Sequence, residues 1–468
     1  MAEITMPVAG ELQFTDGLPA ERRRWAMASY LVGLAMSVLD GNIANTALPS
    51  IATQLHASPA ASIWVVNAFL LTVGICVVPL SSLVDIIGYK KVYQGGLILF
   101  TIASAGCSLP HSLSELVLAR VCQGVGAACI WSTSAAVMRY TYPRALLGRG
   151  IGLGGFVVFT AAAAGPSVAS GILAIATWHW LFAINIPFGL LALSLSERWL
   201  APAQGSRHRW DIWSAVLNGI TVTLLIKGID GVGTGQGVAI VTSELAAAFL
   251  FGTALVWRQN HLAIPMLAID LFKRPIFALS VGASLCAFVA QGLAVVVLPF
   301  YFIDVMNYSQ VMAGLLLSPW PVAAGITSHY SGGLADRIPI RVLGTIGMTG
   351  MTSGLVLLAL VGAHPTAWQI VWRAALGGAG FGIFGAPNNR AMVASAPRER
   401  SGGAGGISTM SRLLGQSIGV SIVAVIFELT ARGGVSLHGA SLALMFGAGF
   451  TALAGIISAA PLPHFHPE

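Results

Sequence analysis

The sequence has few charged residues: Asp, Glu, Lys and Arg make up only 9% of its 468 residues. Soluble domains carry about 25%, so a soluble fold of this size could not cover its surface with so few charges. The hydrophobic share is 56% and the mean hydropathy is +0.81. This composition excludes a water-soluble protein and predicts a surface that faces lipid.

Motifs for catalysis and cofactor binding are also missing. No lysine is followed by Ser or Thr, which excludes a GxxxxGK[ST] phosphate loop. The HExxH motif is absent, which argues against a metal-dependent membrane enzyme. No Cys-x-x-Cys pair occurs, and the five cysteines lie in apolar stretches: Cys76, Cys107, Cys122, Cys129 and Cys286. We therefore expect no metal, no cofactor and no ATP.

Long apolar stretches run through the whole chain. About 20 residues suffice for a helix to cross a ~30 Å hydrocarbon core. Fourteen stretches reach that scale, which predicts an all-α polytopic membrane protein with both termini on one side. They lie near 25–49, 63–84, 92–109, 115–138, 148–173, 179–197, 212–230, 238–257, 276–303, 311–334, 341–362, 367–391, 404–429 and 438–460.

The basic residues predict the orientation. If the N-terminus is cytoplasmic, 19 of the 24 Lys and Arg residues fall in internal segments, and only Arg432 falls in an external loop. Cytoplasmic loops of membrane proteins carry this excess. No basic run is long enough for nucleic acid. We expect a multi-pass protein of the plasma membrane, specifically a bacterial inner membrane, with both termini cytoplasmic.

An internal repeat divides the chain. Residues 83–90 parallel residues 334–341 at an offset of 251, and Arg120 and Gly124 parallel Arg373 and Gly377 at an offset of 253. Pro143-Arg144 parallels Pro397-Arg398 at 254. Matches in one order predict two parallel six-helix halves. The expected domains are a tail at 1–24, a half at 25–200, two inserted helices at 201–260, a half at 261–461 and a tail at 462–468.

Two charged residues fall inside predicted helices. Asp40 lies roughly 20 Å along the first stretch by helical rise, where a charge costs at least ~2.5 kcal/mol, so a functional role such as proton carriage is the default. Burial disfavours the charged form of a carboxyl group, which favours proton exchange. Arg120 is never neutral and must face a cavity or a partner. The alternatives are a neutral Asp40 bonded to Asn42 or Asn45, and an Arg120 that extends to the outer interface.

Two further patterns surround turns and bends. A loop after the second stretch reads Ser81-x-x-x-Asp85-x-x-Gly88-Tyr-Lys90, and its repeat reads Gly332-x-x-x-Asp336-Arg337-x-Pro339-x-Arg341. Gly88 permits a tight turn, and Asp85 can dock on a helix N-terminus, for which the glycine-rich segment 402–406 is suited. The fifth stretch carries Gly165, Pro166 and Gly171, which allow bending and close packing. The alternatives are a solvated loop and plain helix packing.

Together these motifs resemble the major facilitator superfamily, in particular its fourteen-helix drug:proton antiporter branch, over about 25–460. The resemblance implies proton coupling by Asp40 and Arg120, and export directed by the fifth helix. It also implies a cytoplasmic gate. Ser81, Ile86 and Pro339 differ in residue type from the family's gate motif. The gate residues would be Asp85, Gly88, Lys90, Asp336, Arg337 and Arg341.

The sequence therefore predicts a proton-coupled secondary transporter that exports small amphipathic molecules, working as a monomer with protons and the lipid bilayer. An importer or an exporter of an endogenous metabolite on the same fold stays open, as does a receptor or channel without turnover. Lipophilic cations could be attracted by Asp40 and Glu428. The expected cavity residues, each of which could instead form a helix–helix hydrogen bond, are Asn45, Gln123, Asn185, Gln291, Gln416 and Glu428.

Overall fold

The computed structural model describes residues 17–57, 62, 64–202, 210–233, 236–262, 269–308, 310–362, 365–397, 400–431 and 436–460. All regular elements in these ranges are helical. Each of the fourteen predicted stretches coincides with one helix, or with two helical segments that follow one another almost directly.

The first six stretches form the N-terminal half. Its helices are α1 (Ala20–Gln54), α3 (Trp64–Ile87), α4 (Tyr89–Cys107), α5 (Leu113–Ser132), α6 (Ser134–Thr141), α7 (Leu147–Ile175), α8 (His179–Ala183) and α9 (Asn185–Trp199), with a 3-10 turn η1 (Arg144–Leu146) before α7. The next two stretches are α10 (Ile212–Gly233) and α11 (Val238–Asn260).

The last six stretches form the C-terminal half. It begins with the 3-10 turn η2 (Ile269–Lys273) and contains α12 (Pro275–Phe300), a π-helical turn η3 (Tyr301–Val305), α13 (Gln310–Leu317), α14 (Pro319–Leu334), α15 (Ile340–Ala359), α16 (Ala367–Ser395), α17 (Ser401–Ala431) and α18 (Leu437–Ala459).

Eleven helices of the described chain are long and apolar enough to cross a membrane by length and composition alone. The other three predicted spans are shorter, interrupted or more charged than these eleven. α4 begins with Tyr89-Lys90-Lys91, the α13–α14 span is divided at Ser318, and α16 carries Arg373 and Arg390. A helix inside a bundle tolerates such residues because its neighbours, rather than lipid, surround them.

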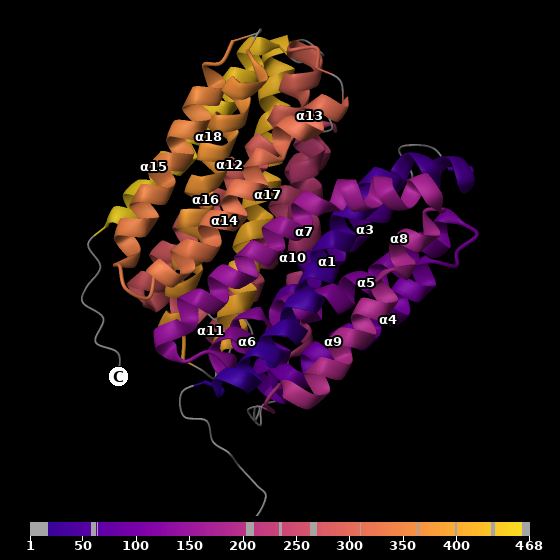
Figure 1. Cartoon of the computed structure of the whole chain (residues 1–468), viewed down its shortest axis with the longest axis vertical. Coiled ribbons are helices and arrows are strands. Elements are labelled where there is room, and N and C mark those ends of the chain that lie inside the picture. The colour runs from indigo at the N-terminus through magenta and orange to yellow at the C-terminus, as the bar shows by residue number, and fades with distance from the viewer. Residues whose placement is uncertain are drawn as a thin grey trace, which may run out of the picture.

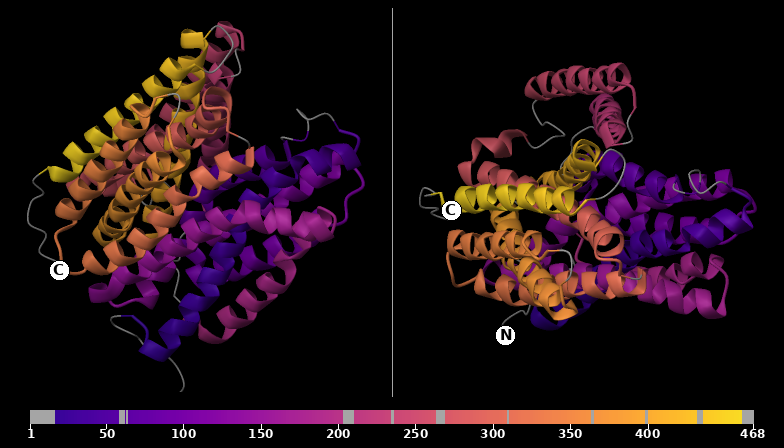
Figure 2. Two further views of the ribbon diagram at one scale, coloured as in Figure 1. Left: turned by 45° about the horizontal axis from the view of Figure 1, so that its top comes forward. Right: turned by 90° about the horizontal axis from the view of Figure 1, so that it is seen from above.

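Each half has its own main hydrophobic core. One contains residues between 283 and 454, and the other contains residues between 18 and 201 with Ala386 and Val393 from α16. The pair α10–α11 packs at the periphery, with α10 against α3 and α17. Figure 2 shows this pair standing outside both halves. The fold is thus two six-helix halves plus two inserted helices.

The halves meet toward the end at which α1 begins, here called the basic end because α1, α4, α7 and α17 all carry Lys or Arg at or near their starts there. In Figure 1 the halves splay apart toward the opposite end. α7 illustrates this arrangement: its first part packs on α14, whereas Ile175 at its far end is 89% exposed. The basic end is therefore where the halves hold each other closed.

Candidate functional site

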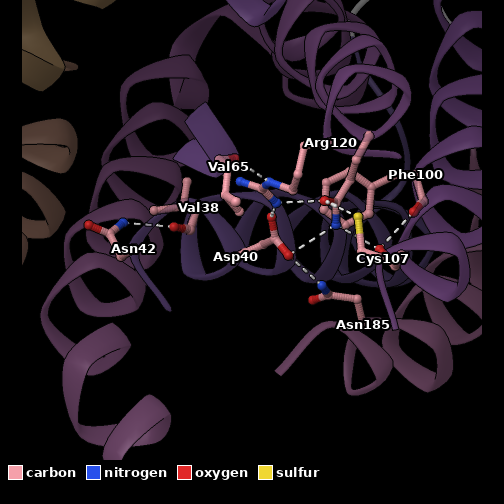
Figure 3. A network of polar contacts seen from close by, with 10 residues as sticks. Val38, Asp40, Asn42, Val65, Phe100, Cys107, Arg120 and Asn185 are labelled. Carbon is pink, nitrogen blue, oxygen red and sulfur yellow. Dashed lines mark hydrogen bonds and ion pairs between the residues drawn. The ribbon is translucent and has the colours of Figure 1, made fainter. Parts of the chain in front are cut away.

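A buried polar network surrounds Asp40 inside the N-terminal half (Figure 3). Arg120 Nη1 donates to Asp40 Oδ2 at 2.5 Å, Asn185 Nδ2 donates to Asp40 Oδ1 at 2.7 Å, and Gln123 Nε2 donates to the same oxygen at 3.0 Å. These side chains come from α1, α5 and α9. Asp40 is 1% exposed and Arg120 is fully buried. Three helices thus converge on one carboxylate.

Arg120 is held by three hydrogen-bond acceptors and two aromatic rings, while its Nη2 has no hydrogen-bond partner among the described residues. Its Nε donates to the Val65 carbonyl at 2.9 Å and its Nη1 also donates to Gln123 Oε1 at 2.6 Å. The Phe69 ring lies 4.2 Å and the Phe182 ring 5.5 Å from its guanidinium carbon. The faces of aromatic rings carry partial negative charge and attract cations. Arg120 therefore does not extend to the outer interface but serves as the charge partner of Asp40.

Three hydrogen-bond donors point at the Asp40 carboxylate, so both of its oxygens are engaged. The alternative in which Asn42 bonds Asp40 is wrong, because Asn42 Nδ2 donates to the Val38 carbonyl at 2.7 Å. The side chain of Asn45 lies outside the described residues.

Gln123 and Asn185, expected to line a substrate cavity, lie inside this network instead. Their side chains are 0% and 2% exposed. Gln123 also donates to Ser104 Oγ at 2.8 Å and accepts from Cys107 Sγ at 3.5 Å. Both amides therefore orient the carboxylate rather than face open space.

The loop acid of each half docks on a helix start of the other half. Asp85 accepts from the backbone N–H of Gly402 at 2.9 Å and of Gly403 at 3.2 Å, at the start of α17. Asp336 accepts from the backbone N–H of Gly148 at 3.0 Å, at the start of α7. Free N–H groups at a helix start and the helix dipole both favour a carboxylate. Two related contacts thus join the halves at the basic end.

Glycine is required on both sides of these contacts. A methyl group at Gly148 would overlap the Gly332 carbonyl and the Asp336 carboxylate, and one at Gly402 would overlap the Ser81 carbonyl and the Asp85 carboxylate. Gly88 has φ +89°, a region that favours glycine, and alone links α3 to α4. The repeat has Pro339 there and a longer connection over 335–339.

The basic residues expected at the gate take other places. Lys90 Nζ donates to the Glu197 carbonyl at 2.8 Å, within its own half. Arg337 and Arg341 are exposed. The cation at Asp336 is Arg390 from α16, whose Nε lies 3.3 Å from Asp336 Oδ1 and whose Nη1 donates to the Ala335 carbonyl.

Sequence reasoning missed Gly148 and Arg390, although the repeat contains a signal for both. At the offset of 251 that relates Asp85 to Asp336, Arg390 corresponds to Arg139, and at 254 Gly402 corresponds to Gly148. Arg139 Nη2 donates across the halves to the Ala396 carbonyl at 3.3 Å. Extending the repeat beyond three matches would have found these positions.

The remaining candidates are dispersed. Gly165 on α7 lies against Asn42 of α1, where a methyl group would clash, whereas nothing lies near Gly171. Gln416 Nε2 donates to Gln291 Oε1 at 3.2 Å between α17 and α12 of the other half. The side chains of Pro166 and Glu428 lie outside the described residues. No group of three or more potential metal ligands gathers in the described residues.

Comparisons with known proteins agree with this architecture. Residues 30–420 match the sequence profile of the Major Facilitator Superfamily. The chain is 45% identical to "Uncharacterized transporter YebQ" of Escherichia coli (strain K12), covering 91% of this chain and 94% of that protein. It is 27% identical to "Riboflavin transporter RibZ" of Clostridioides difficile (strain 630), covering 87% of this chain and 89% of that one.

More distant similarities extend the picture. "Multidrug resistance protein Stp" of Mycobacterium tuberculosis is 29% identical, with 84% of this chain and 73% of that protein covered. Among solved structures, the proton:xylose symporter XylE superposes with a TM-score of 0.63 at 16% identity, covering 94% of this chain and 95% of that one. The latter similarity concerns the fold.

Proposed function

Because the chain belongs to the Major Facilitator Superfamily, a family of transporters, we propose that it is a proton-coupled antiporter that exports small amphipathic molecules across the bacterial inner membrane. The basic end is then cytoplasmic, in line with the excess of Lys and Arg on internal loops. The protein acts as a monomer and needs no ATP.

The observation that carries the proposal is the buried Asp40–Arg120 pair with its two amide donors. An ionisable group this deep in a membrane helix is costly unless it has a task. Among the described residues, such a buried pair lies in the N-terminal half. The offset of 251 places Gln291 opposite Asp40, and Arg373 near the start of α16 has no described acidic partner. Proton coupling is thus assigned to one half.

The transport cycle follows from two sets of contacts. With the basic end closed, Asp40 receives a proton from the outside, loses its hold on Arg120 and lets the halves rearrange. Asp85 and Asp336 then leave the starts of α17 and α7. The proton departs to the cytoplasm, and cargo enters from that side. Cargo and proton therefore bind in different steps of the cycle and cross the membrane in opposite directions.

The direction of transport rests on the antiporter-like pattern of α7, Gly165-Pro166 with Gly171. Relatives named as a multidrug resistance protein and as a riboflavin transporter support small-molecule cargo. A proton-coupled importer on the same scaffold is the rival. Inside-out vesicles with an acidic lumen separate the two. An antiporter takes cargo up into the lumen as protons leave, whereas a proton-coupled importer carries cargo out of the lumen with the protons.

Asp40→Asn is the deciding experiment, since the amide keeps the shape of the carboxyl group but binds no proton. In proteoliposomes with an imposed pH gradient, the variant is expected to lose gradient-driven transport entirely. Its melting temperature in detergent serves to show that it folds. Glu244→Gln on α11, an acid paired with Lys227 at 3.8 Å outside the halves, is the matched control and keeps activity. Full transport by Asp40→Asn would exclude Asp40 from the mechanism.

A further inference from the structure

Arg412 is a second arginine inside the bundle. It lies eleven residues after the start of α17, about 16 Å along the helix by its rise. Its guanidinium carbon lies 4.2 Å from the centre of the Trp131 ring, which belongs to α5 of the other half. Trp131 Nε1 in turn donates to Ser37 Oγ on α1 at 2.8 Å. The arginine therefore faces the opposite half at mid-depth.

The charge of Arg412 is not balanced by the described side chains. No described carboxylate lies within ion-pair distance of it, and no hydrogen bond among described residues engages its guanidinium. Asp40 cannot serve as its counter-charge, because Arg120 already pairs with it. The interface between the halves thus holds an excess positive charge.

The surroundings of Arg412 suit a molecule with an apolar body. Arg412 is partly exposed as a residue. Trp131 packs beside Val77 and Val78 of α3, and Met410 joins them from α17. A guanidinium offers a planar set of donors that binds carboxylate or sulfonate in two-pronged fashion. An aromatic ring and apolar side chains beside it can receive a ring of the same molecule.

We infer that Arg412 and Trp131 form the anion-binding part of the cargo site, and that the preferred cargo is an aromatic organic anion. This inference rests on the proposed transport function and narrows its substrate class. It differs from the expectation that lipophilic cations are attracted by Asp40 and Glu428; the charge of Asp40 is neutralised within the N-terminal half. A cationic cargo at this position would meet an unopposed like charge.

The site also spans the two halves, since Arg412 moves with α17 and Trp131 with α5. An anion that contacts both residues stabilises the arrangement in which they are close. A ligand shifts a conformational equilibrium only by its difference in affinity for the two states. Cargo binding here would therefore favour the described arrangement over one in which α17 and α5 have separated.

Equilibrium binding to the purified full-length protein tests the inference without any gradient. The probes are fluorescein, an aromatic anion, and ethidium, an aromatic cation, measured by fluorescence anisotropy. Wild-type protein is expected to bind fluorescein more tightly than ethidium. Arg412→Gln is expected to weaken fluorescein binding at least tenfold, and Arg412→Lys, which keeps the charge but not the planar donor set, less so. Lys227→Gln, which removes a peripheral intramembrane cation, is the matched control and leaves both affinities unchanged.

Several results would overturn the inference. These are fluorescein affinity unchanged in Arg412→Gln, wild-type protein that binds ethidium but not fluorescein, or wild-type protein that binds neither. Trp131→Leu provides a second variant should Arg412→Gln fail to fold, and it must also weaken fluorescein binding. Proton coupling is tested by transport in Asp40→Asn and the anion site by binding in Arg412→Gln, so failure of the one is distinguishable from failure of the other.

Discussion

At the scale of single residues, the Asp40–Arg120 pair couples charge to structure. Each member is buried, and each is satisfied mainly by the other and by two neighbouring amides. A buried ion pair adds little net stability because both charges lose their hydration, but removing one partner strands the other. Removing either charge alone therefore destabilises the fold.

Arg120→Gln should thus destabilise the protein by about 3–5 kcal/mol, the usual effect of stranding a buried charge. The double variant Asp40→Asn/Arg120→Gln should recover part of that loss, because no lone charge remains. Melting temperatures of the four proteins in one detergent measure the cycle. Additive effects of the two substitutions would show that the residues are not coupled.

A second pair of residues, Lys227 and Glu244, provides a contrast. Their charged atoms lie 3.8 Å apart on the peripheral helices, and the Lys227 side chain is 58% exposed. Neither stands in the buried network, so we assign this pair to packing of α10 on α11. The difference between the two pairs lies in burial rather than in residue type.

At the scale of elements, the starts of α7 and α17 act as paired docking sites. First-turn N–H groups lack a partner within their own helix, and those of Gly148, Gly402 and Gly403 bind the loop acid of the other half. The absence of a side chain at Gly148 and Gly402 lets the facing backbone approach. The contact is made by helix geometry as much as by the acid.

Gly402→Ala is expected to weaken closure of the basic end and lower the transport rate several-fold, since the added methyl group would displace Ser81 and Asp85. Gly95→Ala on α4 is the matched control, because nothing lies within 4 Å of a methyl group at that position, and it should be close to wild type. Initial transport rates in proteoliposomes measure the effect. Equal rates for the two variants would mean that the close approach at Gly402 is not needed.

Asp85→Asn tests the acid of the same contact. The amide keeps an acceptor oxygen but loses the charge, which removes part of a helix-terminus interaction that is worth up to ~2 kcal/mol when partly buried. Transport should slow while the order of substrate preferences stays the same, as determined by competition between substrates. A changed order of preference would place Asp85 in the cargo site instead.

At the scale of the whole molecule, two docked acids hold two halves in one arrangement. Each half has its own main core, and the N-terminal core shares Ala386 and Val393 of α16, so each half can move largely as a body once that contact opens. The contacts at the basic end are therefore the elements that decide which end is closed. The inserted pair α10–α11 stands outside this interface, apart from its packing on α3 and α17.

The double variant Asp85→Asn/Asp336→Asn should shift the population toward an arrangement that is open at the basic end. Spin labels at Lys91→Cys and Arg337→Cys, both exposed and on opposite halves, report this by pulsed electron resonance after the native cysteines are replaced. The distance distribution is expected to broaden toward longer values than in the same labelled protein with both acids intact. An unchanged distribution would show that other contacts hold the halves together.

Much of this architecture could be read from the sequence because membrane helices obey simple local rules. Apolar length marked each span, and the internal repeat marked the two halves. The positions of Asp40 and Arg120 stood out since charge in lipid is rare. Gln123 and Asn185 could not be assigned in this way, because an amide inside a helix bonds a neighbouring helix as readily as it faces a cavity.

Hydropathy and repetition by themselves determined that this protein crosses the membrane as two related helical halves with an intramembrane acid. Only the tertiary structure decided the partners: which donors surround Asp40, that Arg390 rather than Arg337 accompanies Asp336, and that Arg412 faces Trp131 without an acidic partner among the described side chains. The physical reason is range. Spanning depends on local composition, whereas pairing depends on how distant helices are packed.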